Sequence, residues 1–266
     1  MVKPRSRVPP LCFCPCISAV KSPFCYPYRV FKTRSLKPER IDTGDYTHEE
    51  YATFLREIRF INQRLGDRAA LEMTLLAEIT RLDLKEFSVL DVGAGTGELL
   101  GVITEFARAG TRKTRLVGLD LNALSVKEIA AESVKYDEIS PIQGNALNLP
   151  FDNNAFDYAI CSLFTHHLTD EQIPIVLREM SRVARRGIVV IDLERSITAW
   201  FLYQLFCFAY KISHLVRQDG SLSIRKGFRV EEFENIAVDV GLVGFFVTRM
   251  APYRLVLSSR TAIDPR

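Results

Sequence analysis

The sequence predicts an α/β fold, a doubly wound sheet of seven strands that is mostly parallel and has a terminal antiparallel strand. From residue 88 onward, short apolar segments alternate with amphipathic helical segments, which is the order that builds a parallel sheet covered by helices. A turn with three glycines follows the first apolar segment, and two strand-like segments close the chain. Together these features predict one ligand-binding α/β domain.

Seven predicted strands account for this sheet. The last two follow one another and are expected to form an antiparallel pair. The strands are expected at residues 88–92, 115–120, 141–143, 155–162, 187–193, 245–250 and 254–259. Helices are expected at 98–109 and 123–136, from the capping box at 169–172 onward, and at 230–240.

A helical addition is expected before the first strand. The Thr-His-Glu-Glu capping box at residues 47–50 opens a helix with apolar residues at helical spacing, and a second amphipathic helix is expected at about 69–82. These helices would either cover the ligand-binding edge of the sheet or serve only as packing.

Residues 1–40 are expected to form a basic leader without a stable fold. Seven prolines interrupt it, and nine of the chain's 35 basic residues lie here with one acidic residue, Glu39. An organellar transit peptide, a signal peptide or a wrongly chosen start would also give such a segment. Residues 41–266 are expected to form a single domain, with a core at about 86–194 and an insertion at about 195–228.

Charge and cysteine content limit the partners and the compartment. After the leader the chain has 26 basic and 31 acidic residues, which argues against nucleic acid as a partner. Only two of the six cysteines lie outside the leader, which predicts a reducing, cytoplasmic compartment. Cys12, Cys14 and Cys16 lack the paired spacing of a zinc site, so no metal is expected.

The glycine turn carries the prediction of the ligand. It reads Asp91-Val92-Gly93-Ala94-Gly95-Thr96-Gly97. Glycines allow a sharp turn and a close approach of the backbone to a ligand, and the next helix offers free N–H groups. A dinucleotide site would have the spacing G-x-G-x-x-G, whereas this turn has G-x-G-x-G. Asp91 would repel a pyrophosphate and suits a ligand with a cationic ammonium group.

Two further positions complete the predicted ligand site. Asp120 ends the second strand beside the glycine turn, where a carboxylate can accept hydrogen bonds from both ribose hydroxyls. After the third strand, Asn145 offers an amide to an adenine amino group next to Ala146, and Leu121 and Leu147 can cover the ring.

Taken in order, these motifs resemble those of class I S-adenosylmethionine-dependent methyltransferases, which have a Rossmann-like sheet. The resemblance covers roughly residues 86–194. It implies that Asp91 and the glycine turn, including Gly93, Ala94, Gly95 and Gly97, hold the methionine portion of S-adenosylmethionine. It assigns Asp120 to the ribose, and Asn145 with Ala146 to the adenine.

The segment after the fourth strand indicates the class of acceptor. It lacks the Asn/Asp-Pro-Pro-aromatic tetrapeptide of enzymes that methylate base amines or glutamine amides. It is similar instead to small-molecule methyltransferases, in particular those around the quinone-biosynthesis C-methyltransferases. That group usually has Lys-Pro-Gly-Gly before the fifth strand, where this chain has Arg185-Arg186-Gly187, so the quinone assignment is weaker than the methyltransferase assignment.

His166 and His167 are the candidate general bases, because an imidazole can take a phenol or enol proton near neutral pH. One of them could instead stack near the cofactor while the other caps the loop. Asp192, Glu194 and Arg195 end the fifth strand and are expected on the acceptor side. They would orient a substrate hydroxyl or anchor the next helix.

The insertion begins with the most apolar stretch of the chain. Residues 197–210 carry six aromatic residues, among them Trp200 and Tyr203, over a length too short to span a bilayer. The stretch is interpreted first as a lid over a hydrophobic acceptor, with core packing or an interfacial helix on a membrane as alternatives. Residues 217–220 are expected to turn, and 221–227 to form a polar loop.

The sequence therefore predicts an S-adenosylmethionine-dependent methyltransferase that acts on oxygen or carbon of a small hydrophobic or aromatic acceptor, such as a phenol, a quinol or a polyketide-like compound. The first alternative is a protein that retains the cofactor fold without catalysis. The second, an RNA or protein methyltransferase, would need a basic groove that the acidic body does not supply. The expected location is cytoplasmic, with peripheral membrane contact through the aromatic stretch as an option.

Overall fold

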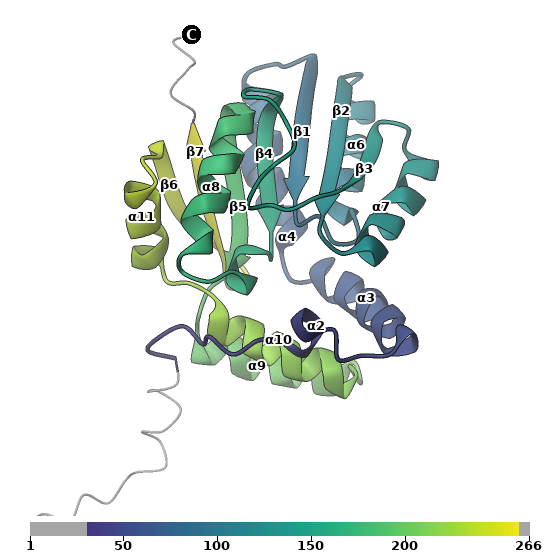
Figure 1. Cartoon of the computed structure of the whole chain (residues 1–266), viewed down its shortest axis with the longest axis vertical. Coiled ribbons are helices and arrows are strands. Elements are labelled where there is room, and N and C mark those ends of the chain that lie inside the picture. Colours follow the sequence, from purple (N-terminus) through teal and green to yellow (C-terminus); the bar gives the residue numbers. More distant parts are fainter. Residues whose placement is uncertain (1–30, 261–266) are drawn as a thin grey trace, which may run out of the picture.

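A computed structural model describes residues 31–260, and its centre is one seven-stranded sheet in the order β3-β2-β1-β4-β5-β7-β6 (Figure 1). The strands β1 to β5 run parallel, and β7 is antiparallel to both of its neighbours. The strands are β1 (Glu86–Val92), β2 (Lys113–Asp120), β3 (Ile139–Gln143), β4 (Phe156–Ser162), β5 (Ala184–Leu193), β6 (Val243–Met250) and β7 (Arg254–Arg260). The predicted sheet is confirmed, with each strand within a few residues of its expected range.

The register of the central strands brings their carboxyl ends together. Asp91 of β1 lies opposite Gly118 of β2 and Ile160 of β4. Because β1 and β4 are covered on both faces, they are almost wholly buried and apolar. The polar residues at their ends therefore gather at one edge of the sheet, where a ligand can bind.

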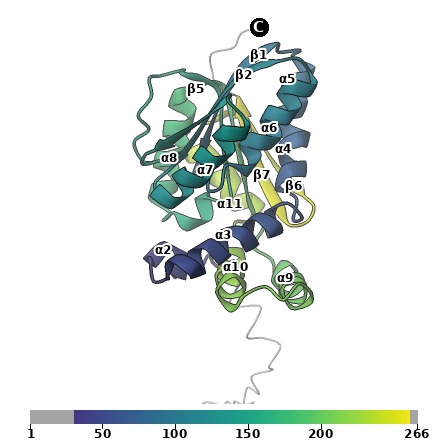
Figure 2. The same cartoon turned by 90° about the vertical axis from the view of Figure 1, so that its right-hand side faces the viewer.

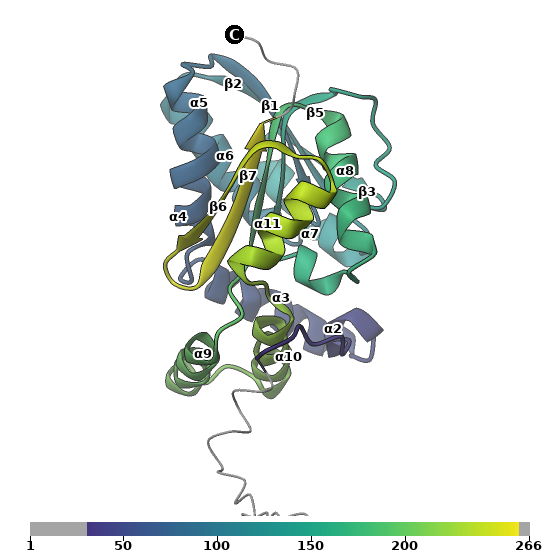
Figure 3. The ribbon, with the colours of Figure 1, turned by 90° about the vertical axis from the view of Figure 1, so that its left-hand side faces the viewer.

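Two layers of helices cover the sheet, and each packs on its own apolar core. One face carries α4 (Asp67–Leu71), η1 (Glu72–Leu76), α5 (Ala77–Arg81), α6 (Glu98–Ala109) and α7 (Ala123–Lys135). The other face carries α8 (Gln172–Val183) and α11 (Val230–Asp239). Figure 3 shows α8 and α11 on one side of the sheet, with α4, α5 and α6 on the other. The helix expected at 69–82 is formed by the three successive segments α4, η1 and α5. Its middle segment, η1, is π-helical.

Four further helices form a cap beyond the carboxyl ends of the strands (Figures 1 and 2). They are α2 (Arg40–Thr43), α3 (His48–Asn62), α9 (Ile197–Ala209) and α10 (His214–Lys226). Thr47 caps the start of α3 with the predicted capping box. The Thr47 hydroxyl accepts a hydrogen bond from the Glu50 N–H, and the Glu50 carboxylate accepts one from the Thr47 N–H. A third apolar cluster, which includes Phe31, Tyr203 and Val216, holds the cap together.

The structure differs from the sequence prediction in the second half of the insertion. Residues 217–227 were expected to form a turn and a polar loop, but α10 runs through them to Lys226. Gly220 lies inside this helix because the Tyr203 hydroxyl packs against it, and a Cβ at this position would collide with that hydroxyl. The same hydroxyl donates a hydrogen bond to the Val216 carbonyl at 2.8 Å. The glycine therefore permits close helix packing and does not end the helix.

The last part of the predicted leader packs on the cap, so the folded region begins before residue 41. Phe31 is buried in the apolar cluster of the cap, which includes residues of α9 and α10. The Arg34 guanidinium bonds the Lys226 and Leu168 carbonyls and the Asp170 carboxylate. The Asp219 carboxylate accepts hydrogen bonds from the N–H groups of Arg40 and Ile41 at the start of α2. We call residues 31–43 the strap. Residues 1–30, with Cys12, Cys14 and Cys16, lie outside the described residues.

Candidate active site

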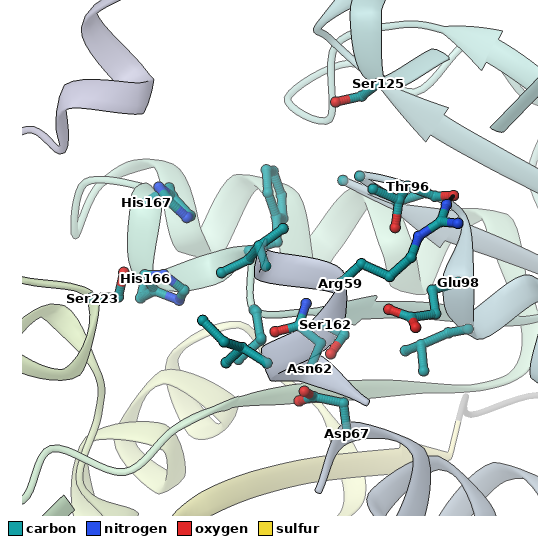
Figure 4. A pocket seen from close by; sticks show the side chains of 18 of the residues that line it. Arg59, Asn62, Asp67, Thr96, Glu98, Ser125, Ser162, His166, His167 and Ser223 are labelled. Carbon is teal, nitrogen blue, oxygen red and sulfur yellow. Dashed lines mark hydrogen bonds between the residues drawn. The ribbon is translucent and has the colours of Figure 1, made fainter. Parts of the chain in front are cut away.

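A cavity of about 1150 Å³ lies between the carboxyl ends of the strands and the cap. Figure 4 shows His166, His167 and Ser223 at one end of this pocket and Arg59, Thr96 and Glu98 at the other. The volume exceeds the roughly 300–1,000 Å³ of typical small-molecule sites, so the cavity has room for two ligands. We call the end with His166 and His167 the histidine end, and the opposite end, with Thr96 of the glycine turn, the glycine end.

The glycine turn forms the floor of the glycine end. Gly93, Gly95 and Gly97 all have positive φ angles, +71°, +55° and +72°, which side-chain-bearing residues rarely adopt. A Cβ on Gly93 would collide with the Phe164 ring. A Cβ on Gly95 would meet no atom within 4 Å, so glycine at this position leaves the backbone open to the cavity. The turn therefore presents its backbone to the cavity, where the sequence predicts the methionine portion of the cofactor.

Asp91 is a buried acid at the end of β1 that also lines the cavity. Among the residues that the structure describes, its Oδ1 has no hydrogen-bond partner. Burial, and to a smaller extent the charge of Asp120, raises the pKa of this carboxyl to about 7. A carboxyl in this state is poised to ionise when a cation binds beside it.

Asp120 holds the glycine turn to the end of β2. Its Oδ2 accepts a hydrogen bond from the Gly95 N–H at 2.9 Å, and its Oδ1 accepts one from the Asn122 N–H at 2.8 Å. Burial raises the pKa of this carboxyl, against the effect of the two N–H donors. Leu121 follows with its side chain largely exposed and lines the cavity.

The third predicted element, Asn145-Ala146, also lines the cavity. The Asn145 Oδ1 accepts a hydrogen bond from the Leu147 N–H at 2.9 Å, which fixes the side chain over the loop after β3. Asp91, Asp120 and Asn145 come from three neighbouring strands. The structure therefore brings the predicted cofactor residues to one end of one cavity.

Helix α3 lines the glycine end of the cavity. Of the two roles expected for this helix, it therefore covers the edge of the sheet where a ligand can bind. The Tyr51 hydroxyl lies 3.2 Å from the Ser125 hydroxyl at the start of α7. Arg59 forms an ion pair with Glu132 at 3.2 Å and donates a long hydrogen bond to the Thr96 carbonyl. Sequence reasoning missed Arg59 because its partners lie on segments far away along the chain.

At the histidine end, His166 is buried and held by the last acid of β5. Its Nδ1 lies 2.6 Å from the Asp192 Oδ1, and its backbone N–H donates to Asp192 Oδ2 at 3.0 Å. Burial alone would raise the pKa of the Asp192 carboxyl, but the charge and hydrogen bond of His166 outweigh it and hold the pKa at about 2. Asp192 lies beneath His166 and does not line the cavity itself.

His167 lies beside His166, with ring centroids 4.2 Å apart, and is held by the strap. Its Nδ1 lies 2.9 Å from the Asp42 Oδ1 and 3.9 Å from the Glu39 Oε1. Burial disfavours the charged imidazolium, but the charges of Glu39 and Asp42 outweigh that effect and raise the pKa of His167. Burial likewise opposes the charge on Asp42, yet His167 and Lys226 lower the pKa of its carboxyl.

Lys226 supplies a positive charge behind the two strap carboxylates. Its ammonium group lies 3.1 Å from the Glu39 Oε1 and 3.3 Å from the Asp42 Oδ2. Glu39, His166 and His167 each place one possible metal-ligand atom within 4.8 Å of the others, but the lysine already balances the carboxylates. Sequence reasoning missed Glu39, Asp42 and Lys226. The one available signal was the Glu39-x-x-Asp42 spacing at the end of the proline-rich segment.

Like Asp192, Arg195 and Trp200 were predicted for the acceptor side and do not line the cavity. The Arg195 guanidinium is buried, and it bonds the Phe31 and Gly227 carbonyls and the Glu232 carboxylate. Trp200 packs against the apolar cluster of the cap. Arg195 therefore anchors the strap, whereas the sequence suggested contact with a substrate hydroxyl or with the next helix. Tyr203 does line the cavity, together with Leu202 and Phe206 of α9.

Comparisons with known proteins agree with this arrangement. Residues 89–187 match the model of the methyltransferase domain family. Residues 89–187 form a methyltransferase domain. The match begins inside β1 and ends inside β5, so it includes the glycine turn, Asp120, Asn145 and both histidines. The predicted class I methyltransferase core is confirmed.

The curated relatives of this methyltransferase domain include two demethylmenaquinone methyltransferases. The one from Bacillus licheniformis is 35% identical over 128 residues, which cover 47% of this chain and 52% of the relative. The one from Shouchella clausii is 35% identical over 127 residues, with the same two shares. The chain therefore matches about half the length of these relatives.

Solved structures share the fold of the methyltransferase domain at low sequence identity. A SAM-dependent methyltransferase from Aquifex aeolicus superimposes with a TM-score of 0.55, 17% identity, and coverage of 78% of this chain and 98% of that chain. A magnesium protoporphyrin IX methyltransferase from Synechocystis, solved with bound SAH, gives a TM-score of 0.57, 14% identity, and coverage of 82% and 97%.

Proposed function

We propose that this chain is an S-adenosylmethionine-dependent methyltransferase whose acceptor is a small hydrophobic or aromatic molecule with an ionisable O–H group. The observation that carries the proposal is Asp91, a buried carboxyl in a cavity lined by glycine backbone, whose Oδ1 has no hydrogen-bond partner within residues 31–260. An uncompensated buried carboxyl is costly, and a cationic ammonium group would relieve that cost.

Four features of the glycine end fit the cofactor. Asp91 would pair with its ammonium group, and the open backbone at Gly95 would lie against its methionine portion. Asp120 would accept from the ribose hydroxyls, and Asn145 would face the adenine edge. When bound, S-adenosylmethionine supplies an electrophilic methyl group on its sulfonium, so the protein mainly aligns the reactants.

His167 is the residue that we assign to proton removal. Its side chain is 25% exposed, compared with 3% for His166, and it lines the cavity. Because Nδ1 is bonded to Asp42, the neutral ring carries its proton there and keeps Nε2 as the basic atom. The acceptor O–H proton would pass to Nε2 as the oxygen or the adjacent carbon takes the methyl group.

The apolar walls of the cavity support an apolar acceptor. Phe164, Leu168, Leu202 and Phe206 line the cavity together with the two histidines. A flat or aromatic acceptor would pack on such side chains while its hydroxyl meets the polar cluster. The demethylmenaquinone methyltransferases among the relatives act on a quinone-type acceptor, which fits this chemistry.

Incubation with methyl-labelled S-adenosylmethionine and a panel of phenols, quinols and polyketide-like acids tests the proposal. We expect labelled product with at least one class of acceptor, and its mass spectrum distinguishes an oxygen-bound from a carbon-bound methyl group. If no acceptor is labelled although S-adenosylhomocysteine binds, the chain is a cofactor-binding protein without transferase activity.

A further inference from the structure

Helix α9 has two apolar faces with different environments. Its inner face, with Ala199, Tyr203 and Phe206, lines the cavity. Its outer face is exposed, and Figures 2 and 3 show α9 at the end of the molecule away from the sheet. The outer face carries Ile197, Phe201, Leu202, Leu205 and Phe208. Nothing in the fold of residues 31–260 covers these side chains, so their exposure calls for a partner.

The spacing of these residues produces one continuous stripe. Ile197, Phe201, Leu205 and Phe208 recur at intervals of four, four and three residues, which places them on one side of a helix. Phe201 is 62% exposed and Phe208 is 80% exposed. At 13 residues the helix is roughly 20 Å long, shorter than the roughly 30 Å of a bilayer core. In residues 31–260 no helix has the length and apolar character to cross a membrane.

Basic residues surround both ends of the stripe. Exposed Lys32 lies near the first turn of α9, because the Lys32 carbonyl accepts a hydrogen bond from Arg195, just before that helix. Exposed Lys211 follows the last turn of α9. Arg64 lies over the Phe60 ring, which contacts Tyr210 after the last turn of α9. This combination of an apolar stripe and a cationic rim matches an anionic lipid surface.

The distribution of acidic residues also favours an anionic surface as the partner of α9. Residues 197–218 contain no Asp or Glu, and neither do residues 1–30, which carry Lys3, Arg5, Arg7, Lys21 and Arg29. Residue 31, where the described chain begins, packs against α9 itself. The acidic side chains near the ends of α9 are few. Glu194 pairs with Arg249, and Glu57 accepts from the Ser213 N–H. Exposed Glu231 lines a small surface pocket with Ile197, but Arg195, Arg229 and Arg249 line it too.

We propose that the outer face of α9 docks the protein on an anionic membrane surface, with the helix lying parallel to it and its aromatic side chains in the headgroup region. The position of Leu202 links this surface to the cavity, because this residue is both exposed and part of the cavity wall. An apolar acceptor could then pass from the membrane to His167 along α9. The docking surface stands without the proposed function, whereas this entry route rests on it.

Co-sedimentation of the full chain with lipid vesicles tests the docking surface. Vesicles of phosphatidylcholine containing phosphatidylglycerol should retain the protein, vesicles of phosphatidylcholine alone should retain less, and added salt should release it. The double substitution Phe201→Ser and Phe208→Ser should weaken partitioning by about tenfold or more, because both rings leave water on docking. These two residues do not line the cavity, so binding of S-adenosylhomocysteine should be unchanged.

A matched control uses exposed apolar residues elsewhere on the surface. Phe246 is 69% exposed and Val243 is also exposed, both on the edge strand β6. The double substitution Phe246→Ser and Val243→Ser should leave vesicle binding intact. The proposal is overturned if wild-type protein stays in the supernatant with anionic vesicles, or if both double variants bind equally well. It is also overturned if the wild type is a dimer in solution that Phe201→Ser and Phe208→Ser convert to monomer, since the face then binds a second copy.

Discussion

The Asp42 Oδ1 lies 2.9 Å from the Nδ1 of His167, although the two residues are 125 positions apart in the sequence. The strap therefore supplies the carboxylate that orients the base proposed for the methyltransferase domain. Three contacts hold the strap in place. Arg34 bonds the Lys226 carbonyl, Arg195 bonds the Phe31 carbonyl, and the Asp219 carboxylate of α10 accepts from the N–H at the start of α2. The proposed reaction thus depends on a segment that lies outside the matched domain.

Replacement of Asp42 by asparagine tests this orienting contact. Loss of the carboxylate removes a charge that raises the pKa of His167, so the acid limb of the pH–rate profile should move to lower pH. The rate on the plateau should fall by roughly tenfold or more, because the base is weaker and less well oriented. Asp45→Asn is the matched control, since Asp45 is exposed and its carboxylate lies 3.7 Å from Arg40. An unchanged profile for Asp42→Asn would remove Asp42 from the mechanism.

The buried Asp91 predicts a proton linkage in cofactor binding. Its pKa lies near 7 in the folded chain, against an ordinary value of 3.8, so the folded protein keeps a proton that the unfolded chain releases. Stability without ligand should therefore fall as pH rises from 3.8 to about 7. A bound ammonium group favours the ionised carboxylate, so S-adenosylmethionine should release the Asp91 proton when it binds below pH 7. Its affinity should therefore rise by about tenfold for each pH unit up to about pH 7.

Calorimetry in buffers of different ionisation enthalpy measures that proton release. Asp91→Asn should abolish both the released proton and the pH dependence, and should weaken binding by more than tenfold, because a charge-assisted interaction is lost. Equal proton release by the wild type and Asp91→Asn would assign the linkage to another group and would leave the ammonium without its proposed partner.

Arg195 is expected to be important for stability, not for substrate contact. Arg195→Met leaves the Gly227 carbonyl without its side-chain donor. It also removes one of the donors to the Phe31 carbonyl and to the Glu232 carboxylate, both of which Arg229 bonds as well. We expect a loss of about 2–4 kcal/mol in the free energy of unfolding. Arg249→Met removes an exposed pair with Glu194 and should change the stability far less, because solvent screens an exposed ion pair. Similar denaturant midpoints for the two variants would contradict the anchoring role.

The sheet and the glycine end could be predicted from the sequence because their signals are local. Strand and helix periodicity, the turn at 91–97 and the acid at the end of β2 are each visible within one short window. The residues Asp91, Asp120 and Asn145 meet simply because parallel strands end at the same edge.

The histidine end was only half predictable because its partners come from distant segments. Glu39 and Asp42 lie in a proline-interrupted segment without periodicity, and their contacts with Lys226 span 187 and 184 positions. Gly220 suggested a turn, since a glycine at a tight helix–helix contact has the same local pattern as a glycine at a helix end. In both cases tertiary packing overrides the local signal.

The rate of methyl transfer in a single turnover, compared between the wild type and His167→Ala, shows whether His167 removes the acceptor proton. With an acceptor identified from the panel, we expect a fall of roughly 100-fold or more in the variant. Binding of S-adenosylhomocysteine should be unchanged. The control variant His48→Ala, which changes an exposed histidine at the start of α3, should transfer at the wild-type rate. Transfer by His167→Ala at the wild-type rate across the pH range would show that His167 is not the base.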